Sequence, residues 1–129
     1  TEMDVVDGRL LAEGEKAPLL VAEFGPGGRY ELLDEWLGDY ASGFGFFRPY
    51  ASDRGGVQPE PWHLSYAPVS EQALAAFSLD MLRAALAGAQ LDAPETVARR
   101  LPGIWERYVV NVDRPPAGRG VTFQTTMPS

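Results

Sequence analysis

The sequence is most informative in what it lacks: it has no cysteine, one lysine (Lys16) and one histidine (His63) among 129 residues. Without cysteine, disulfide bonds and thiolate metal sites are excluded. The net charge of −7 argues against binding to nucleic-acid backbones or anionic membrane surfaces, which select basic faces. Hydrophobic runs are all far shorter than the roughly 18 residues that a membrane span needs, so none is expected. Solubility is the simplest explanation of the acidity.

The length suits one domain, and the composition, with 45% apolar and 22% charged residues, is typical of globular proteins. The apolar periodicity predicts an α+β fold, in which a small antiparallel sheet packs with helices and the C-terminal half is helical. Strands are expected over residues 2–6, 44–50 and 62–66, and the Gly-rich loop between the last two predicts a hairpin. Helices are expected over residues 30–40, 70–88 and 93–104.

Several local features refine these expectations. One apolar stripe from Leu74 to Leu86 predicts a single helix, with Ser70 as its N-cap and Gly88 as its end. Pro102 is expected to kink or break the next helix, and residues 108–110 are expected to be extended. Surface loop is expected over residues 8–28, with residues 19–21 turned inward, and a mobile tail over residues 113–129.

The only histidine lies in the segment PEPWHLSY, three residues after Glu60. A histidine in an apolar strand is commonly a packed core residue, and this is the first interpretation of His63. The second is a metal site, in which His63 is a ligand and Glu60 takes a proton from a metal-activated water. A helical arrangement of the two is disfavoured because Pro61 follows Glu60.

The metal hypothesis makes a geometric demand on this segment. In a straight strand, residues three apart point to opposite faces and their α-carbons lie roughly 10 Å apart. Glu60 must therefore lie on a bend before the strand, which Pro61 is suited to fix. Trp62 would then point away from the site and anchor the segment in the core.

One imidazole is too few for a catalytic zinc, which usually takes three protein ligands, so the others must be carboxylates. The first residues, TEMDVVDG, supply them, and strand alternation places Glu2 and Asp4 on the same face. Burying the charge of Asp4 beside Val5 and Val6 would need a reason, such as a metal. The alternative is that Asp4 lies at an exposed strand edge.

The segments GFGFFRPY and DRGGVQPEPWHLSY resemble the end of the catalytic core of VanY-like D-alanyl-D-alanine carboxypeptidases, zinc peptidases related to the lysostaphin and hedgehog-type fold. The family pattern is His-x-x-Gly-x-x-x-Asp followed, after a long interval, by Glu-x-Trp-His. EPWH at 60–63 matches the second part, and TEMD at 1–4 resembles the end of the first. The resemblance implies a peptidase-like domain over residues 1–112, with a motif-bearing core (1–68) and a helical extension (69–112).

The resemblance also implies roles for single residues. Asp4 and His63 would bind one zinc ion, Glu60 would be the general base, and Trp62 would support the site from behind. The substrate would be a peptide, such as a cell-wall stem peptide ending in D-alanine in the bacterial cell envelope, and Arg48 and Arg54 are candidates to bind its carboxylate. No partner is implied beyond this substrate, and the oligomeric state stays open.

The first His-x-x-Gly of the family pattern is absent before Thr1. The chain is therefore expected to be part of a longer protein, and to hold zinc weakly or not at all without the missing ligand. A natural relic without a complete metal site is the other explanation. The alternative function is a peptide-binding or scaffold domain that keeps the peptidase fold without catalysis.

Overall fold

Strand β3, His63–Tyr66, is the centre of the fold and pairs with a strand on each side. In this computed structural model, which describes residues 1–117, the sheet has three strands in the order β1-β3-β2, and both pairings are antiparallel. β1 spans Glu2–Asp4 and β2 spans Phe46–Phe47. The predicted α+β fold and the β2–β3 hairpin pairing are confirmed, although β1 and β2 are shorter than expected.

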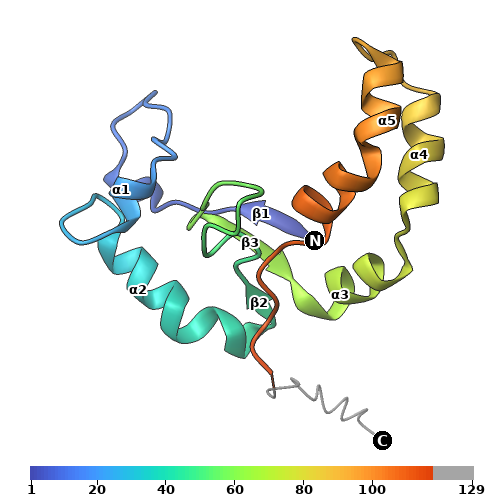
Figure 1. Cartoon of the computed structure of the whole chain (residues 1–129). Coiled ribbons are helices and arrows are strands. Elements are labelled where there is room, and N and C mark those ends of the chain that lie inside the picture. Colours follow the sequence, from blue (N-terminus) through green and yellow to red (C-terminus); the bar gives the residue numbers. More distant parts are fainter. Residues whose placement is uncertain (118–129) are drawn as a thin grey trace, which may run out of the picture.

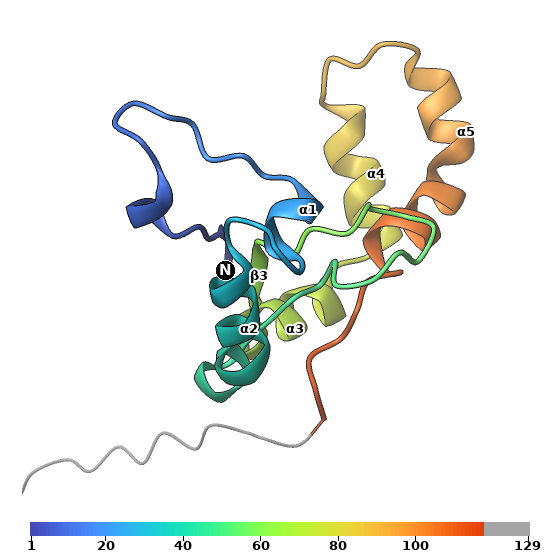
Figure 2. The same ribbon diagram turned by 90° about the vertical axis from the view of Figure 1, so that its left-hand side faces the viewer.

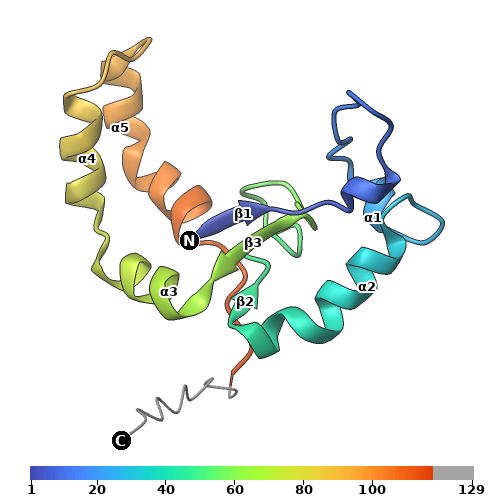
Figure 3. The ribbon, with the colours of Figure 1, turned by 180° about the vertical axis from the view of Figure 1, so that it is seen from behind.

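Helices flank the sheet on two sides (Figures 1 and 3). The helical elements, in chain order, are η1 (Gly8–Leu10), α1 (Val21–Phe24), α2 (Glu31–Tyr40), η2 (Ala41–Phe44), α3 (Ala67–Ala76), α4 (Leu79–Ala87), α5 (Pro94–Ile104) and the π-helical turn η3 (Trp105–Val109). α1 and α2 lie on one side, and α3 leads from β3 to the α4–α5 hairpin on the other (Figure 1). Within residues 1–117, no helix is long and apolar enough to cross a membrane.

The core lies between the sheet and α2, in two neighbouring clusters. Phe24, Tyr30 and Trp62 form the first, and Leu37, Ala41 and Leu64 form the second. The partly buried Leu33 of α2 packs against both, so that α2 joins the two clusters. Because Leu64 faces α2, strand alternation directs its neighbours His63 and Ser65 to the opposite face of the sheet.

The helical half differs from its prediction in its boundaries. The expected single helix over residues 70–88 is two helices, because Ser78 adopts an extended conformation and its side chain accepts a hydrogen bond from the Met81 N–H, at 3.2 Å. The apolar stripe continues across this break, which is why the periodicity concealed it. Ser70 lies inside α3 and does not cap it, whereas Gly88 ends α4 as predicted.

Two other local predictions are wrong, and the break that was one of the two outcomes predicted at Pro102 is not found. Residues 19–21 are exposed, because the buried anchor of this segment is Phe24 in α1. Pro102 lies inside α5 and does not break it at that residue; α5 runs to Ile104. The π-helical turn η3 follows, closed by a bond from Val110 N–H to the Trp105 carbonyl at 3.1 Å, so residues 108–110 are not extended. Of the predicted tail, residues 118–129 lie outside the described part of the chain.

Candidate functional site

The pairing of β1 with β3 brings Asp4 and His63 together. The two residues are opposite each other in the antiparallel register and therefore share a face of the sheet. An oxygen of Asp4 (Oδ1) lies 2.9 Å from Nδ1 of His63, although 59 residues separate them in sequence. The Asp4 carboxylate is about half exposed, as expected of an edge strand, and the His63 side chain is mostly covered. His63 is thus not sealed in an apolar core.

Glu60 lies on a bend before β3, as the metal hypothesis requires. The backbone N–H of His63 donates to the backbone carbonyl of Glu60 at 3.1 Å, and this bond closes a turn through Pro61 and Trp62. This turn returns the Glu60 carboxylate to the imidazole, and its Oε2 lies 3.9 Å from Nδ1 of His63. Two carboxylates, those of Asp4 and Glu60, therefore face the same ring nitrogen.

Glu2 contacts the other ring nitrogen. Its Oε2 lies 2.9 Å from Nε2 of His63, and its Oε1 accepts a hydrogen bond from the hydroxyl of Ser65 at 2.6 Å. Glu2 and Ser65 are opposite each other in the register, two positions along from the Asp4–His63 pair. The sequence placed Glu2 on the face of Asp4, among the carboxylates that could be metal ligands, but did not predict its contacts with His63 and Ser65. Its contact depends on a register between strands far apart in the chain.

Tyr50 is a second residue that the sequence analysis missed. Its ring packs on the imidazole of His63, with ring centroids 5.1 Å apart and planes tilted by 37°. Its carbonyl accepts a hydrogen bond from the Glu60 N–H at 2.9 Å, so one residue holds both Glu60 and His63. Burial raises the pKa of Tyr50, and the nearby charges of Glu2 and Glu60 add to this effect. The sequence gave no signal, because Tyr50 reaches the site only through the loop conformation.

Trp62 is placed as predicted. Its side chain is buried, and its ring centroid lies 5.6 Å from that of Phe24 in the first core cluster. Because it lies directly before His63 in the chain, its burial against Phe24 and Tyr30 anchors the turn that carries Glu60.

The two arginines proposed as carboxylate ligands contact other partners. Arg48 pairs with Asp34 of α2 at 2.8 Å, on the side of the sheet that Leu64 faces. Arg54 donates to the side chain of Asn111 at 3.0 Å and contacts Asp113 at 3.4 Å. Among the described residues, neither arginine contacts His63 or Glu60. Their predicted role therefore has no support from these contacts.

The C-terminal segment is attached to the loop between β2 and β3 that carries Tyr50. The Asp113 N–H donates to the Pro49 carbonyl at 2.9 Å, and the carboxylate of Asp113 accepts from the Ser52 N–H at 2.8 Å and from its hydroxyl at 2.9 Å. Arg107 of η3 donates to the Gly55 carbonyl. Figure 2 shows this loop beside the turn that follows α5. The helical half thus supports the loop that holds Tyr50.

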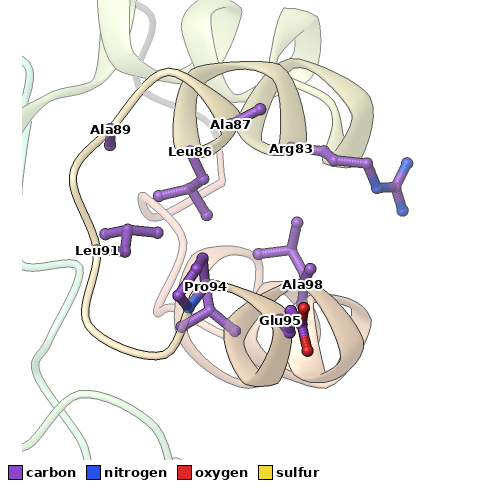
Figure 4. A pocket seen from close by; sticks show the side chains of 10 residues that line it. Arg83, Leu86, Ala87, Ala89, Leu91, Pro94, Glu95 and Ala98 are labelled. Carbon is purple, nitrogen blue, oxygen red and sulfur yellow. The ribbon is translucent and has the colours of Figure 1, made fainter.

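Two hollows are relevant to function. One, of about 150 Å³, borders the site, and its lining includes Glu2, Tyr50, Ser65 and Ser70. The Ser70 hydroxyl is buried without a hydrogen-bond partner. The other, of about 300 Å³, lies between α4 and α5; its lining is mostly apolar, and Arg83 and Glu95 are its charged residues (Figure 4). None of the residues around His63 lines this second hollow, so it is not placed to hold a substrate at His63.

The donors on the Nδ1 side of His63 fit part of a zinc site. Zinc–ligand bonds of about 2.0–2.1 Å in tetrahedral geometry place two donors about 3.3 Å apart. The Asp4–His63 separation of 2.9 Å is slightly shorter, so a small opening would admit the ion between them. Within residues 1–117, no group of three or more histidine, aspartate or glutamate side chains is arranged to hold a metal ion. Asp4 and His63 could thus supply two ligands of an incomplete site, and the Glu60 carboxylate lies 3.9 Å from the same ring nitrogen.

Comparison with known proteins gives one informative relative. An uncharacterized protein of Haemophilus influenzae is 32% identical over 112 residues, which cover 85% of this chain and 86% of that protein. The chain belongs to the family of this Haemophilus protein. No family model matches the chain. No solved structure matches it either. Membership in this family does not by itself assign a function, so a function has to be argued from the geometry around His63.

Proposed function

We propose that this domain is the core of a zinc-dependent peptidase, in which Asp4 and His63 bind the metal and Glu60 is the general base. The observation that carries the proposal is the meeting of three residues, from β1, β3 and the turn before β3, around one ring nitrogen. A hydrogen bond from Nδ1 of His63 needs one carboxylate, and Asp4 at 2.9 Å already provides it. A cation shared by Asp4 and His63 would also explain why the Glu60 carboxylate lies nearby, at 3.9 Å, where it could take a proton.

Each residue contributes to this chemistry in a definite way. When bound, zinc supplies a Lewis acid that polarises a carbonyl and lowers the pKa of a water molecule to about 7. Glu60 then accepts the proton of the attacking water and passes it to the leaving amine. The Tyr50 carbonyl holds the backbone of Glu60, and the Tyr50 ring covers His63. Trp62 fixes the turn between Glu60 and His63 from the core side.

The substrate part of the proposal rests on the VanY-like resemblance. A cell-wall peptide ending in D-alanine is the expected substrate class. Neither Arg48 nor Arg54 contacts the site residues, so the group that would bind the terminal carboxylate is not one of these two in the described arrangement.

A second candidate is a peptide-binding or scaffold domain without catalysis. The observation in its favour is that both nitrogens of His63 already contact carboxylates, those of Asp4 and Glu2. A protonated imidazole between two carboxylates is a satisfied structural arrangement that needs no metal.

Hydrolysis with a matched pair of variants separates the two functions. We expect a longer protein that supplies the missing histidine, when loaded with zinc, to release the terminal residue of a peptide ending in D-Ala-D-Ala, and we expect this chain alone to be weakly active or inactive. Glu60→Gln should lower the rate by about 100- to 10,000-fold, the usual contribution of a general base. Glu35→Gln, a substitution at an exposed glutamate of α2, is the control and should leave the rate unchanged. Hydrolysis that Glu60→Gln leaves undiminished would remove Glu60 from its role, and peptide binding without hydrolysis would favour the scaffold function.

A further inference from the structure

We propose that the outer edge of β1 binds an extended basic peptide as an added strand, and that one apolar side chain of this peptide fills a hollow beside α3 and α4. The partner is defined by its chemistry: an extended backbone, lysine or arginine at two alternate positions, and an apolar residue at the next alternate position. The inference does not rest on the proposed zinc chemistry, because strand pairing needs only the backbone of β1.

The backbone of β1 has one paired edge and one open edge. The Val5 N–H donates to the Trp62 carbonyl at 3.0 Å, on the side of β3. Successive residues of an antiparallel strand direct their backbone groups to opposite sides, so Asp4 and Glu2 point their N–H and C=O groups away from β3. Within residues 1–117, no strand pairs with β1 on that outer side. An open edge of this kind accepts an extended peptide through main-chain hydrogen bonds.

The other edge strand, β2, has a neighbour. One hollow is lined jointly by Phe46 and Phe47 of β2 and by Asp113 and Pro116 of the segment after α5. This segment therefore runs beside β2, as Figure 1 shows. All three residues of β1, by contrast, are exposed. β1 is thus the edge at which a partner strand can pair.

A mostly apolar hollow of about 360 Å³ lies where β1 begins. Its lining joins Glu2 of β1 to Leu74 of α3, and continues to Phe77 and to Met81 of α4. Because Glu2 lines it, an added strand antiparallel to β1 would pass the hollow and direct toward it the side chains on its Glu2 face. The Ser70 hydroxyl, which is buried without a hydrogen-bond partner, belongs to the same lining. The hollow is therefore suited to an apolar side chain of a peptide whose backbone supplies a partner for this hydroxyl.

The charges of β1 select a basic partner. The carboxylates of Glu2, Asp4 and Glu60 meet one imidazole, so this face is negative at neutral pH in either state of the ring. The side chains of Glu2 and Asp4 are still 45% and 51% exposed. Opposite charges at facing positions of a strand pair are favourable, and like charges are unfavourable. The same charges oppose pairing with β1 of a second copy, which would place acidic residues opposite one another.

The test is an NMR titration of the metal-free chain with the peptide Lys-Val-Lys-Thr-Leu, capped at both ends. In antiparallel pairing its two lysines face Asp4 and Glu2, and its leucine reaches the hollow. We expect saturable binding with the largest amide shifts in β1 and around Met81. A peptide that does not bind at millimolar concentration, or that shifts other regions instead, would overturn the proposal. So would self-association of the protein through β1, since a second copy would then occupy the edge.

Two N-methylated peptides test the strand pairing itself. Methylating the two lysine nitrogens removes the N–H groups that face β1, and should weaken binding by about 10-fold or more, because two hydrogen bonds are lost. Methylating the valine and threonine nitrogens alters N–H groups that face away from β1, and should change the affinity little. Equal affinities of the two methylated peptides would show that the peptide does not pair as a strand.

Matched substitutions test the hollow and the charges. Met81→Gln should weaken binding by about 3- to 10-fold, because it makes the lining more polar. Leu32→Gln, at a residue of α2 that is 80% exposed, is the control and should have no effect. Replacing both lysines of the peptide by glutamate should abolish binding. An affinity that neither Met81→Gln nor this charge reversal changes would contradict the assigned partner.

These outcomes are distinguishable from those of the proposed function. If the peptide pairs with β1 but no zinc-dependent hydrolysis is found, the peptidase function fails and the docking edge stands. If hydrolysis depends on Glu60 while the peptide does not bind at β1, only the docking edge fails.

Discussion

The β1–β3 site and the α4–α5 hairpin are built in opposite ways. At the site, polar side chains meet across long separations in sequence, 59 residues for Asp4 and His63 and 63 for Glu2 and Ser65. In the hairpin, two consecutive helices enclose a mostly apolar hollow (Figure 4). Its fully buried residue is Leu101. The site has specific chemistry and a supporting core behind it. The hairpin has neither, and the segment after α5 connects it to the loop that carries Tyr50.

Because of this difference, the two regions are expected to respond differently to substitution. The core formed by Phe24, Tyr30 and Trp62 fixes the site from one side, and the C-terminal segment fixes its loop through Asp113. A change in the core should therefore affect both stability and the site, whereas a change in the hairpin should affect the hairpin first. The following predictions test this, from the largest expected effect to the smallest.

Trp62→Ala should have the largest effect, about 3–5 kcal/mol of unfolding free energy, the usual cost of removing a buried tryptophan. The side chain is 9% exposed and packs on Phe24, so its loss opens a cavity behind the turn that carries Glu60. Urea denaturation gives the measurement. Trp36→Ala, which removes a half-exposed tryptophan of α2, should cost about 1 kcal/mol. Equal costs for the two tryptophans would contradict the core described above.

Leu101→Ala should cost about 2–4 kcal/mol, because Leu101 is 1% exposed and large-to-small changes in cores fall in this range. The informative readout is amide hydrogen exchange, resolved by residue. We expect exchange to accelerate in α4 and α5 and to change little in β3, since the two regions share few contacts. Equal acceleration in β3 would show that hairpin and site unfold as one unit.

Asp113→Asn should cost about 1 kcal/mol, because it weakens hydrogen bonds to a charged acceptor. Burial alone would raise the pKa of Asp113, but hydrogen bonds from the Ser52 N–H and hydroxyl, with Arg54 nearby, outweigh it and hold the pKa below 3.8. A depressed folded-state pKa means that the contribution is present above the unfolded value and is lost as the pH falls through the folded value.

The measurement for Asp113 is unfolding free energy against pH. The difference between the unsubstituted protein and Asp113→Asn should be constant near neutral pH and shrink as the pH falls below about 4. Asp39→Asn, at an exposed aspartate of α2, is the control and should show no such difference. A difference that grows on acidification would have the wrong sign for a depressed pKa.

Met81→Ala should have the smallest effect, within about 0.5 kcal/mol, because its side chain is 54% exposed on the hairpin. Unfolding in urea is again the measurement. A cost comparable with that of Leu101→Ala would mean that the hollow lined by Met81, Phe77 and Glu2 is filled in solution, for instance by another molecule.

The sequence predicted those parts of the site that depend on local pattern or on the family motif. The strand at His63 and the anchoring of Trp62 follow from the apolar alternation, and the bend at Glu60 is what the metal hypothesis required of this segment. The structure has all three. The contact of Glu2 with His63 depends on the register between β1 and β3, and a one-residue slip would have turned Glu2 to the other face. No local pattern specifies that register across about sixty residues.

The errors have equally specific causes. Arg48 was expected near the substrate, but its guanidinium pairs with Asp34 of α2. The position of α2 over the sheet depends on tertiary packing, which the local sequence does not specify. The helix break at Ser78 was hidden because the apolar stripe from Leu74 to Met81 keeps helical spacing across it. Ser78 is a favourable N-cap, so the signal was present, but the periodicity outweighed it.

Calorimetric titration of the protein with zinc tests the central claim, the meeting of Asp4 and His63 at a cation site, most directly. We expect zinc binding by this chain to be weak, and we expect Asp4→Asn and His63→Gln each to abolish what binding there is while Glu35→Gln leaves it intact. Binding of unchanged strength in the Asp4→Asn or His63→Gln variant would contradict the proposed site.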